Sequence, residues 1–403
     1  MYRTHCMVCQ ATELATIIDL GMHPYADTFV PPARSSEADR LYHLACDLCG
    51  RCGHIQLRCQ TDPEARYSDH EYSYTSSNSA FSRGHWERYA RDVGKENDVA
   101  AGDVVVEVGS NDGYLLEQFL KQGAVVLGID AAPAMAALAA ERRVNTLVGL
   151  FDQNLASQAQ ERLGRAKLVL ANNVFNHAED VVGFARAAAQ LLAEDGTFVY
   201  ELPYWCEGIR DGHFDQIYHE HVSYFTARSS RRIAEEAGLY VHKIEVVDYH
   251  GGSLRVSARL ARDGAVEDPK MARMIEEEVA EGMFGPETYR AFMDKVTRRR
   301  DEFLEKLYSL RNDGVAVVGV GAAAKGNTML NFYRLDHSVV ECVTDASPYK
   351  QAKLTPGTRI PIRGDEALAQ YERVAALILS WNIADRLKDK LRAINSNIEF
   401  LHP

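Results

Sequence analysis

The sequence predicts an α/β fold in three parts: a small metal-bound domain, a doubly wound Rossmann-like domain, and a C-terminal Rossmann-like α/β domain. Three observations support this prediction. Cys-x2-Cys turns fall before residue 60, apolar strands alternate with helices from Asp103 onward, and a second glycine-rich unit starts after Gly314. The length of 403 residues agrees, because one domain takes about 150 residues on average. We expect the domains to cover residues 1–68, 69–258 and 259–403.

The composition excludes several classes of protein. Its 46% hydrophobic and 25% charged residues fit a soluble globular chain with buried cores. The formal charge of −12 disfavours binding to nucleic acid as the main activity, because that affinity needs a basic surface, whereas small anionic ligands need only local donors. The first residues lack the apolar core of a signal peptide, and no stretch approaches a membrane-spanning helix. We therefore expect a cytoplasmic protein without membrane partners.

The first domain is expected to be held together by a structural zinc ion. Cys6 and Cys9 form one Cys-x2-Cys turn, and two such turns complete a tetrahedral shell of thiolates. Cys46, Cys49 and Cys52 are equally spaced, so either Cys46 and Cys49 or Cys49 and Cys52 can form the second turn. We favour Cys6, Cys9, Cys49 and Cys52 as the ligands. The acidic composition argues against the competing interpretation, a zinc ribbon that binds nucleic acid.

Strands and helices alternate in the second domain, after an aromatic-rich connector. The expected apolar strands cover residues 104–108, 125–130, 168–171 and 197–201. Such nearly continuous apolar strands, separated by helices, indicate a parallel sheet that is covered on both faces. Two further strands, residues 240–247 and 253–260, flank Gly251-Gly252 and read as an antiparallel pair. This ending is typical of class I methyltransferases.

The first glycine loop follows a buried strand and opens a helix. Its spacing, E-x-G-x-x-x-G from Glu107 to Gly113, differs from the G-x-G-x-x-G of a dinucleotide site. A carboxylate beside free backbone N–H groups suits the ammonium and carboxylate of S-adenosylmethionine, and Asp130 at the next strand end suits its ribose. A turn without a ligand is the alternative. The expected contacts of this cofactor are Glu107, Gly109, Ser110, Asn111, Gly113, Asp130, Asn172 and Asn173.

A cluster of histidines and tyrosines follows the strand that ends at Glu201. Residues 211–225 hold a run of histidine, tyrosine and acidic side chains that can donate, accept or bind protons, which packing alone does not explain. Histidine has the near-neutral pKa that a general base needs, so we expect a base here that removes a proton from an acceptor carbon. The alternatives are a metal site formed by His219 and His221, or a loop that is merely hydrogen-bonded.

The C-terminal part begins with a helical spacer, residues 268–311, with a break near Gly285-Pro286. A G-x-G-x-x-A loop then starts at Gly319, and Asp345 follows its last residue by twenty-one positions, as in dinucleotide-binding folds. Lys325 and Asn327 come directly after the loop, and a lysine at a helix N-terminus suits a diphosphate. We favour a nucleotide-sugar diphosphate over NAD and over a remnant without a ligand.

In combination, these motifs resemble the sugar C-methyltransferases that act on nucleotide-linked 4-keto-6-deoxysugars. The resemblance covers nearly the whole chain and is far more specific than any one motif. It rests on Cys6-x2-Cys9, Cys49-x2-Cys52-Gly-His-Ile-Gln-Leu, Glu107-Val-Gly-Ser-Asn-Asp-Gly, Asn172-Asn-Val-Phe-Asn-His177, Tyr218-His-Glu-His-Val-Ser-Tyr224, His250-Gly-Gly-Ser-Leu-Arg255 and Gly321-Ala-Ala-Ala-Lys-Gly-Asn.

The resemblance implies a three-domain enzyme with structural zinc, S-adenosylmethionine, and a dTDP- or GDP-linked 4-keto-deoxysugar between the last two domains. It implies methylation of a ring carbon beside the C4 ketone, commonly C3, with His221 as the base and Tyr218, Glu220 and Tyr72 as its neighbours. It assigns substrate contacts to His177, Tyr224, Lys325 and Asn327. We expect a monomer or small homo-oligomer. An NAD-dependent nucleotide-sugar enzyme and an O- or N-methyltransferase are the alternative functions.

Overall fold

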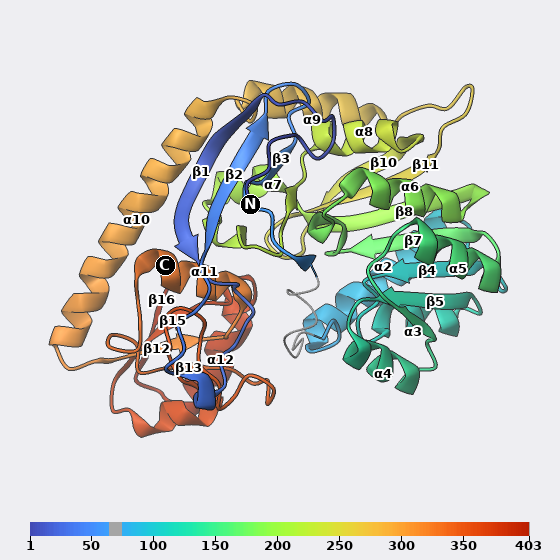
Figure 1. Ribbon diagram of the computed structural model, residues 1–403. Helices are drawn as coiled ribbons and strands as arrows, with labels where there is room; N and C mark the ends of the chain where they lie inside the picture. Colours follow the sequence, from blue (N-terminus) through green and yellow to red (C-terminus); the bar gives the residue numbers. More distant parts are fainter. Residues whose placement is uncertain (64–74, 403) are drawn as a thin grey trace.

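The computed structural model describes residues 1–63 and 75–402, whose strands form three sheets (Figure 1). The described residues contain no helix with both the length and the apolar character that crossing a bilayer requires. Helix α10 (Pro286–Asn312) runs along the outside of the molecule, beside the N-terminal sheet, to the C-terminal domain.

The N-terminal sheet is antiparallel and has four strands in the order β1-β2-β3-β9. Its strands are β1 (Leu14–His23), β2 (Tyr42–Cys49), β3 (Ile55–Leu57) and β9 (Ser223–Tyr224), and the short helix η1 (Pro32–Arg34) lies between β1 and β2. The first three strands come from the N-terminal domain, whereas β9 comes from the middle of the chain. This pairing was not predicted, and it joins the metal-binding part to the segment that carries His221.

The central sheet has seven strands in the order β10-β11-β8-β7-β4-β5-β6. Its parallel strands are β4 (Val104–Val108), β5 (Val125–Asp130), β6 (Thr146–Val148), β7 (Ala166–Asn172) and β8 (Leu192–Pro203). The last two strands, β10 (Leu239–Val247) and β11 (Ser253–Leu260), are antiparallel to their neighbours. The predicted parallel sheet with an antiparallel ending is therefore confirmed, as is the turn at Gly251-Gly252.

Helices cover both faces of the central sheet (Figure 1). They are α2 (Ala80–Glu96), α3 (Tyr114–Lys121), α4 (Pro133–Glu141), α5 (Gln153–Leu163), η2 (Phe175–His177), α6 (Val181–Leu191) and α8 (Ala227–Glu236). Two further short helices, α7 (Trp205–Asp211) and η3 (Phe214–Gln216), lie in the segment between β8 and β9. The interior strands β7 and β8 are buried over most of their length, because helices pack on both sides of them. The polar residues at their carboxyl ends are therefore the part of these strands that can contact a ligand.

The C-terminal domain is a parallel five-stranded sheet in the order β14-β13-β12-β15-β16. Helix α9 (Pro269–Ala280) and α10 lead into it and are separated at Gly285-Pro286, as predicted. Its elements are β12 (Ala316–Val320), α11 (Ala324–Tyr333), β13 (Cys342–Thr344), β14 (Ile362–Arg363), η4 (Asp365–Gln370), β15 (Val374–Ile378), η5 (Trp381–Ile383), α12 (Ala384–Ile394) and β16 (Ile398–Leu401).

Candidate functional site

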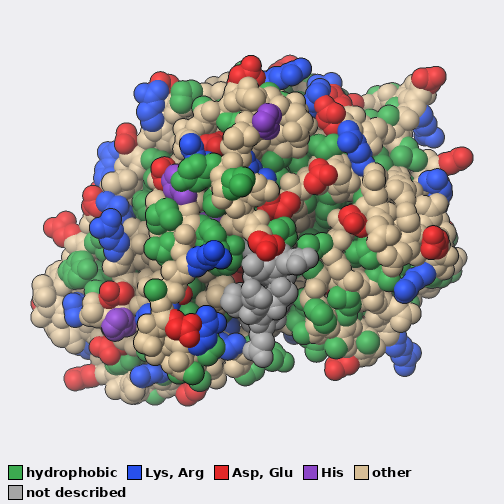
Figure 2. All heavy atoms as spheres, viewed as in Figure 1, with side chains coloured by type: hydrophobic (Ala, Val, Ile, Leu, Met, Phe, Trp, Pro, Cys, Tyr) green, Lys and Arg blue, Asp and Glu red, His purple; other side chains and the backbone are tan. Residues whose placement is uncertain are grey.

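A cavity of about 780 Å³ is lined by the carboxyl end of the central sheet, by residues 211–225, called the connector from here on, and by the N-terminus of α11. The carboxyl edge of an open parallel sheet is where such folds bind ligands. On the face shown in Figure 2, acidic and basic side chains are interspersed rather than segregated. Binding to the long backbone of a nucleic acid would require a continuous basic surface, which this view does not show.

One end of the cavity is built by the first glycine loop. Gly109 has a φ of +69°, and a Cβ there would lie 2.7 Å from the Val174 side chain, so the close approach of these two segments requires glycine. Asp130 accepts hydrogen bonds from the backbone N–H groups of Asn111 and Ala132, both at 2.8 Å. The loop is thereby anchored to the end of β5.

Two polar side chains near this loop lack partners among the described residues. Glu107 is 5% exposed, and its Oε2 atom has no hydrogen bond. Burial, together with the charges of Asp112 and Asp130, raises the pKa of Glu107 well above its usual value. Both amide atoms of Asn172 are also buried without hydrogen bonds. A ligand with a positive charge and polar edges would satisfy these groups, because buried polar atoms are normally paired.

The middle of the cavity holds His221, whose tautomer is set by its neighbour. Its Nδ1 lies 2.8 Å from the carbonyl oxygen of Gln216. A carbonyl can only accept, so Nδ1 carries the proton and Nε2 keeps a lone pair. Burial is the main reason that the pKa of His221 is lowered to about 3, and the charge of Lys325 adds to it. The ring lies 3.9 Å from the ring centre of Tyr218 and 5.3 Å from that of His177.

The other end of the cavity is formed by the C-terminal domain. Lys325 is the second residue of α11, and its Nζ donates to Oδ1 of Asn382 at 3.1 Å. It also lies 4.4 Å from the ring centre of Trp381, which is cation–π distance. Burial lowers the pKa of Lys325 to about 8, although the charge of Asp215 opposes this effect. Lys325 therefore remains a cation at neutral pH.

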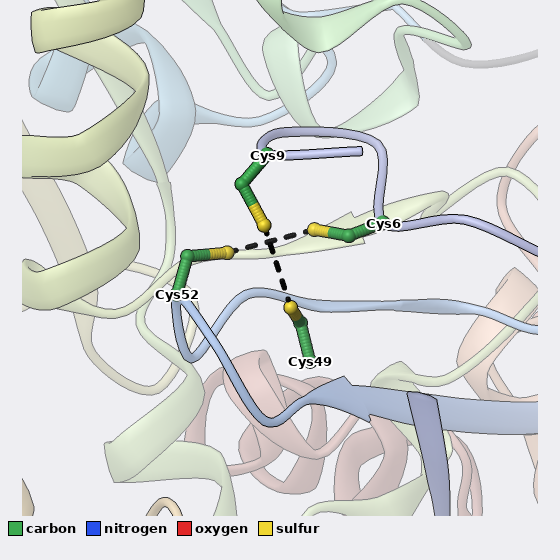
Figure 3. A group of neighbouring side chains, drawn as sticks. All are labelled: Cys6, Cys9, Cys49 and Cys52. Atoms are coloured by element: carbon green, nitrogen blue, oxygen red, sulfur yellow. Dashed lines mark hydrogen bonds between the residues drawn. The ribbon is translucent and has the colours of Figure 1, made fainter. Parts of the chain in front are cut away.

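A separate cluster of four thiols lies in the N-terminal domain (Figure 3). The Sγ atoms of Cys6, Cys9, Cys49 and Cys52 all lie within 4.8 Å of one another, with Cys6 to Cys52 at 3.5 Å and Cys9 to Cys49 at 3.6 Å. Tetrahedral zinc with Zn–S bonds of about 2.3 Å needs sulfur separations of about 3.8 Å, so the cluster fits. Cys46 belongs to β2 and lies outside the cluster, which favours the predicted ligand set.

Most of the residues predicted for the site meet in the large cavity. Its lining includes Glu107, Gly109, Ser110, Asn111, Asp130, Asn172, Asn173, His177, Tyr218, Glu220, His221 and Lys325. Tyr72, predicted as a neighbour of the base, lies outside the described residues. The fold therefore brings together residues that are more than two hundred positions apart in the sequence.

Three predicted residues lie elsewhere among the described residues. Gly113 caps α3 with a φ of +73°, and a Cβ there would meet Ala139 at 3.0 Å, so this glycine serves helix packing. Tyr224 lies behind the cavity, with its ring centre 4.7 Å from that of Trp205. The side chain of Asn327 donates to the carbonyl oxygen of Ala26 at 2.7 Å, which joins α11 to the N-terminal domain.

Sequence reasoning missed four residues that contribute to the cavity or its walls. Asp27, His250 and Lys350 line it directly, and Asn382 holds Lys325. Lys350 and Asn382 lie in the segments that follow strands β13 and β15, so the rule that selected Asn172 indicates these segments but neither residue in particular. His250 was part of a recognised motif without an assigned role. Asp27 comes from a loop after β1, and nothing in its local pattern indicated a site.

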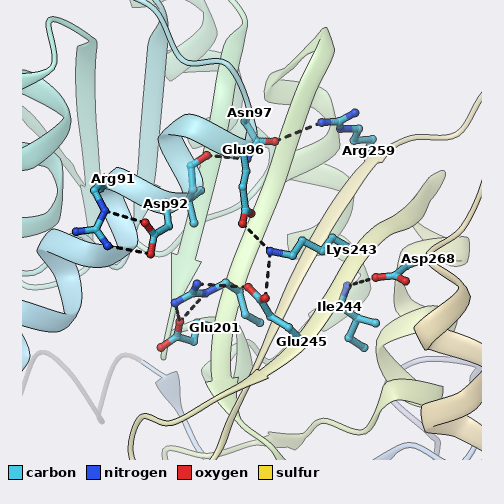
Figure 4. A network of polar contacts seen from close by, with 12 residues as sticks. Arg91, Asp92, Glu96, Asn97, Glu201, Lys243, Ile244, Glu245, Arg259 and Asp268 are labelled. Carbon is cyan, nitrogen blue, oxygen red and sulfur yellow. Dashed lines mark hydrogen bonds and ion pairs between the residues drawn. The ribbon is translucent and has the colours of Figure 1, made fainter.

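A buried charge cluster supports the wall behind Asn172. Glu201 is fully buried at the end of β8; its Oε1 lies 2.7 Å from His85 Nε2, and Arg255 donates to its Oε2 at 2.7 and 2.8 Å. Burial raises the pKa of Glu201, but the bond from His85 and the charge of Arg255 outweigh it and leave a net lowering. Figure 4 shows this carboxylate beside a second, more exposed group, in which Lys243 bridges Glu96 and Glu245.

Comparisons with known proteins agree with this arrangement. Residues 6–67 match a family described as a zinc binding domain, residues 83–244 match "Methyltransferase domain", and residues 248–403 match "C-methyltransferase C-terminal domain". The chain is 32% identical to C-methyltransferase NovU of Streptomyces niveus over 392 residues, which is 97% of this chain and 93% of that protein.

Other similarities cover only part of the chain. The ubiquinone biosynthesis O-methyltransferase of Rhodopseudomonas palustris (strain BisA53) is 29% identical over 99 residues, which is 25% of this chain and 39% of that protein. Among solved structures, magnesium protoporphyrin IX methyltransferase of Synechocystis PCC 6803 is 16% identical, with a TM-score of 0.36, over 45% of this chain and 85% of that one.

Proposed function

The chain belongs to the C-methyltransferase family, and we propose that it methylates a nucleotide-linked sugar on carbon. The enzyme is an S-adenosylmethionine-dependent C-methyltransferase. The proposed acceptor is a 4-keto-6-deoxysugar on a dTDP or GDP diphosphate, the methylated carbon is C3, and the product is a branched sugar. One observation carries the proposal: a methyl-donor loop, a histidine lone pair and a buried lysine face the same cavity.

His221 is the proposed base. Its Nε2 lone pair takes the proton from the carbon beside the ketone, and the electron pair of the broken C–H bond moves into an enolate with its charge on the C4 oxygen. Gln216 accepts from Nδ1 and so stabilises the imidazolium that forms. The low pKa of His221 keeps the lone pair available at neutral pH, at the cost of a weaker base, which binding in near-attack geometry offsets.

The donor end of the cavity fits S-adenosylmethionine through its unpaired groups. Glu107 offers a buried carboxylate to the ammonium, Asp130 lies where the ribose is expected, and Asn172 has donor and acceptor atoms free for polar edges. When bound, this cofactor supplies an electrophilic methyl carbon whose bond to sulfur breaks as the new C–C bond forms. The buried walls exclude water from that step.

The acceptor end is suited to a diphosphate. Ala324 and Lys325 line the cavity in the first turn of α11, where backbone N–H groups favour anions, and the side chain of Lys325 adds a cation. The net charge of −12 does not prevent this, because these donors act locally. The four cysteines would hold Zn²⁺ in a closed shell that has no open position for catalysis, so zinc has a structural role.

Replacing the proposed base tests this function. His221→Asn should lower kcat by more than about 10²-fold, the usual contribution of a positioned base, while the Kd for S-adenosylhomocysteine stays within twofold. The assay is methyl transfer to dTDP-4-keto-6-deoxyglucose, followed by mass spectrometry. His242→Asn, on the outer strand β10, is the control because His242 is exposed and far from the cavity.

Hydrogen exchange in D₂O separates this function from the alternatives. With S-adenosylhomocysteine present, the wild type should exchange a hydrogen beside the ketone, and NMR would identify whether C3 or C5 exchanges. An O- or N-methyltransferase, or an NAD-dependent enzyme, would leave both C–H bonds unexchanged. Full methylation by His221→Asn would contradict the assignment of the base.

A further inference from the structure

His250 lies at the turn between β10 and β11 and faces the same cavity as His221. Its φ of +54° places it in the left-handed region, and Gly251 and Gly252 follow it with φ values of +84° and +98°. A non-glycine residue in that region is held there by its surroundings. The structure therefore keeps an imidazole at a strained position that the proposed mechanism does not yet use.

The protonation of His250 follows from its hydrogen bonds. Lys325 donates to one side-chain atom of Asn382 at 3.1 Å, and a lysine cation can only donate, so this atom is the oxygen. The amide nitrogen of Asn382 then faces Nδ1 of His250, also at 3.1 Å. An amide nitrogen can only donate, so Nδ1 accepts. The proton of the neutral ring is therefore on Nε2.

His221 and His250 consequently present opposite chemistry. His221 donates from Nδ1 to a carbonyl and keeps a lone pair on Nε2, whereas His250 accepts at Nδ1 and carries N–H at Nε2. Among the described residues, no protein group accepts a hydrogen bond from Nε2 of His250. Burial, followed by the charge of Lys325, lowers the pKa of His250 to about 3, so the ring stays neutral.

The residue that sets this tautomer is itself firmly held. Trp381, next to Asn382, donates from Nε1 to Asp215 at 2.6 Å, and its ring stacks on His213 with centres 3.8 Å apart. A Cβ at Gly251 would lie 2.5 Å from the Trp381 ring, so the turn and the C-terminal domain pack closely. His213 and Asp215 belong to the connector that leads to His221. The donor and the base are thus positioned by one continuous set of contacts.

We propose that His250 is a catalytic residue whose Nε2–H donates to the C4 oxygen of the acceptor, with Asn382 as the positioning residue that sets its tautomer. This inference rests on the proposed function. As His221 Nε2 takes the proton from the carbon, the electron pair moves onto the ketone oxygen, and the hydrogen bond from His250 strengthens. When that carbon bonds to the methyl group, sulfur keeps the electrons of the broken S–CH₃ bond and the ketone reforms. A neutral donor suits this role because it stabilises the oxyanion without fully protonating it.

The first experiment measures exchange of the hydrogen beside the ketone of dTDP-4-keto-6-deoxyglucose in D₂O, with S-adenosylhomocysteine bound. His250→Ala should slow exchange and methyl transfer together by about 10²–10³-fold, which is the usual effect of losing one oxyanion donor. The Kd for S-adenosylhomocysteine should stay unchanged in His250→Ala. The thermal midpoint should stay unchanged in the control variant, His242→Ala. Exchange at the wild-type rate in folded His250→Ala would overturn the proposal.

The second experiment keeps the ring and inverts its tautomer. A carboxylate in Asn382→Asp can only accept, so it draws the proton of His250 to Nδ1 while pairing with Lys325. NMR of ¹⁵N-histidine-labelled protein, assigned by difference from His250→Ala, should show N–H at Nε2 in the wild type and at Nδ1 in the variant. Exchange should fall at least tenfold in the variant, whereas Asn154→Asp on the surface of α5 should have no effect.

The outcomes separate this inference from the proposed function. If the wild-type protein exchanges neither the C3 nor the C5 hydrogen, the proposed function itself is wrong. Wild-type exchange that depends on His221 but not on His250 or Asn382 leaves the function standing and overturns the inference. An Nδ1–H tautomer of His250 in the wild type would overturn it as well.

Discussion

At the scale of single residues, the protonation states in the cavity are decided by one or two contacts each. His221 and His250 are chemically identical side chains, but a carbonyl beside one and an amide N–H beside the other give them opposite tautomers. Glu107 has no counter-charge among the described residues, so it is ready for a cationic ligand. Lys325 is a buried cation at the end of the cavity that the C-terminal domain forms.

Binding of the acceptor should depend on the proton of Lys325. Because burial lowers its pKa to about 8, the free enzyme loses this cation as the pH rises through 8, whereas a bound diphosphate favours the charged form. The Kd for thymidine diphosphate should therefore be constant below about pH 7 and rise up to about tenfold per pH unit above 8. Calorimetry between about pH 6 and 9.5 measures this.

Lys325→Met provides the matched comparison. This variant should bind thymidine diphosphate weakly, with little change across the same pH range. If the wild type shows no loss of affinity above pH 8, then Lys325 does not contact the diphosphate.

The sequence was informative about residues at strand ends and much less informative about their partners. Glu107, Asp130 and Asn172 could be predicted because a local pattern, a polar residue at the end of an apolar strand, marks the binding edge. His250 could not be given a role, because its tautomer depends on Asn382, which is 132 positions away. Gly113 and Tyr224 matched motifs, but packing against Ala139 and Trp205 accounts for their positions.

At the scale of elements, α2 is fixed to the central sheet by a buried charged contact on the side of the helix that faces the sheet. His85 on α2 and Arg255 on β11 both bond to Glu201 at the end of β8, and the ring of Tyr249 stacks on His85 with centres 3.6 Å apart. This cluster joins three elements directly behind Asn172. The sequence indicates only an aromatic-rich connector in this region, because the partners of its buried histidine lie far away in the sequence.

Removing one partner of this cluster should be costly. Arg255→Met leaves the Glu201 carboxylate buried with His85 alone, and breaking a buried pair costs about 3–5 kcal/mol of the free energy of unfolding. Lys243→Met, which removes the more exposed bridge to Glu96 and Glu245, should cost at most about 1 kcal/mol. Urea denaturation of both full-length variants measures the difference. Equal losses of the free energy of unfolding would show that the buried cluster stabilises the fold no more than the exposed one.

At the scale of the whole molecule, the alternating pattern was enough to predict the central sheet and its antiparallel ending. The assignment of β9 to the N-terminal sheet could not be predicted, because a two-residue strand has no periodicity of its own. Ser223 pairs with Gln56, and the side chain of Gln56 accepts a hydrogen bond from the backbone of Met7, inside the Cys6-x2-Cys9 turn. The segment that carries His221 is therefore joined to the metal-binding turn through β3.

Zinc removal should consequently reduce catalysis more than binding of the methyl donor. Chelation, or Cys49→Ala, should release one zinc per chain and lower methyl transfer at least tenfold, because the segment after His221 loses its partner strand. The Kd for S-adenosylhomocysteine should change by less than about threefold. Cys46→Ala should retain zinc, as measured by mass spectrometry of the metal; loss of zinc in that variant would contradict the ligand set.

The pairing of β3 with β9 also decides how this enzyme can be recombined with its relatives. The backbone N–H of Leu57 donates to the carbonyl oxygen of Val222, one residue after His221, so the first 63 residues and the connector 211–225 form a matched pair of surfaces. A chimaera joined near residue 68 would place strand β3 of one parent against residues 211–225 of the other parent. Exchange of acceptor preference between relatives should therefore succeed when both segments are moved together, and fail when either is moved alone.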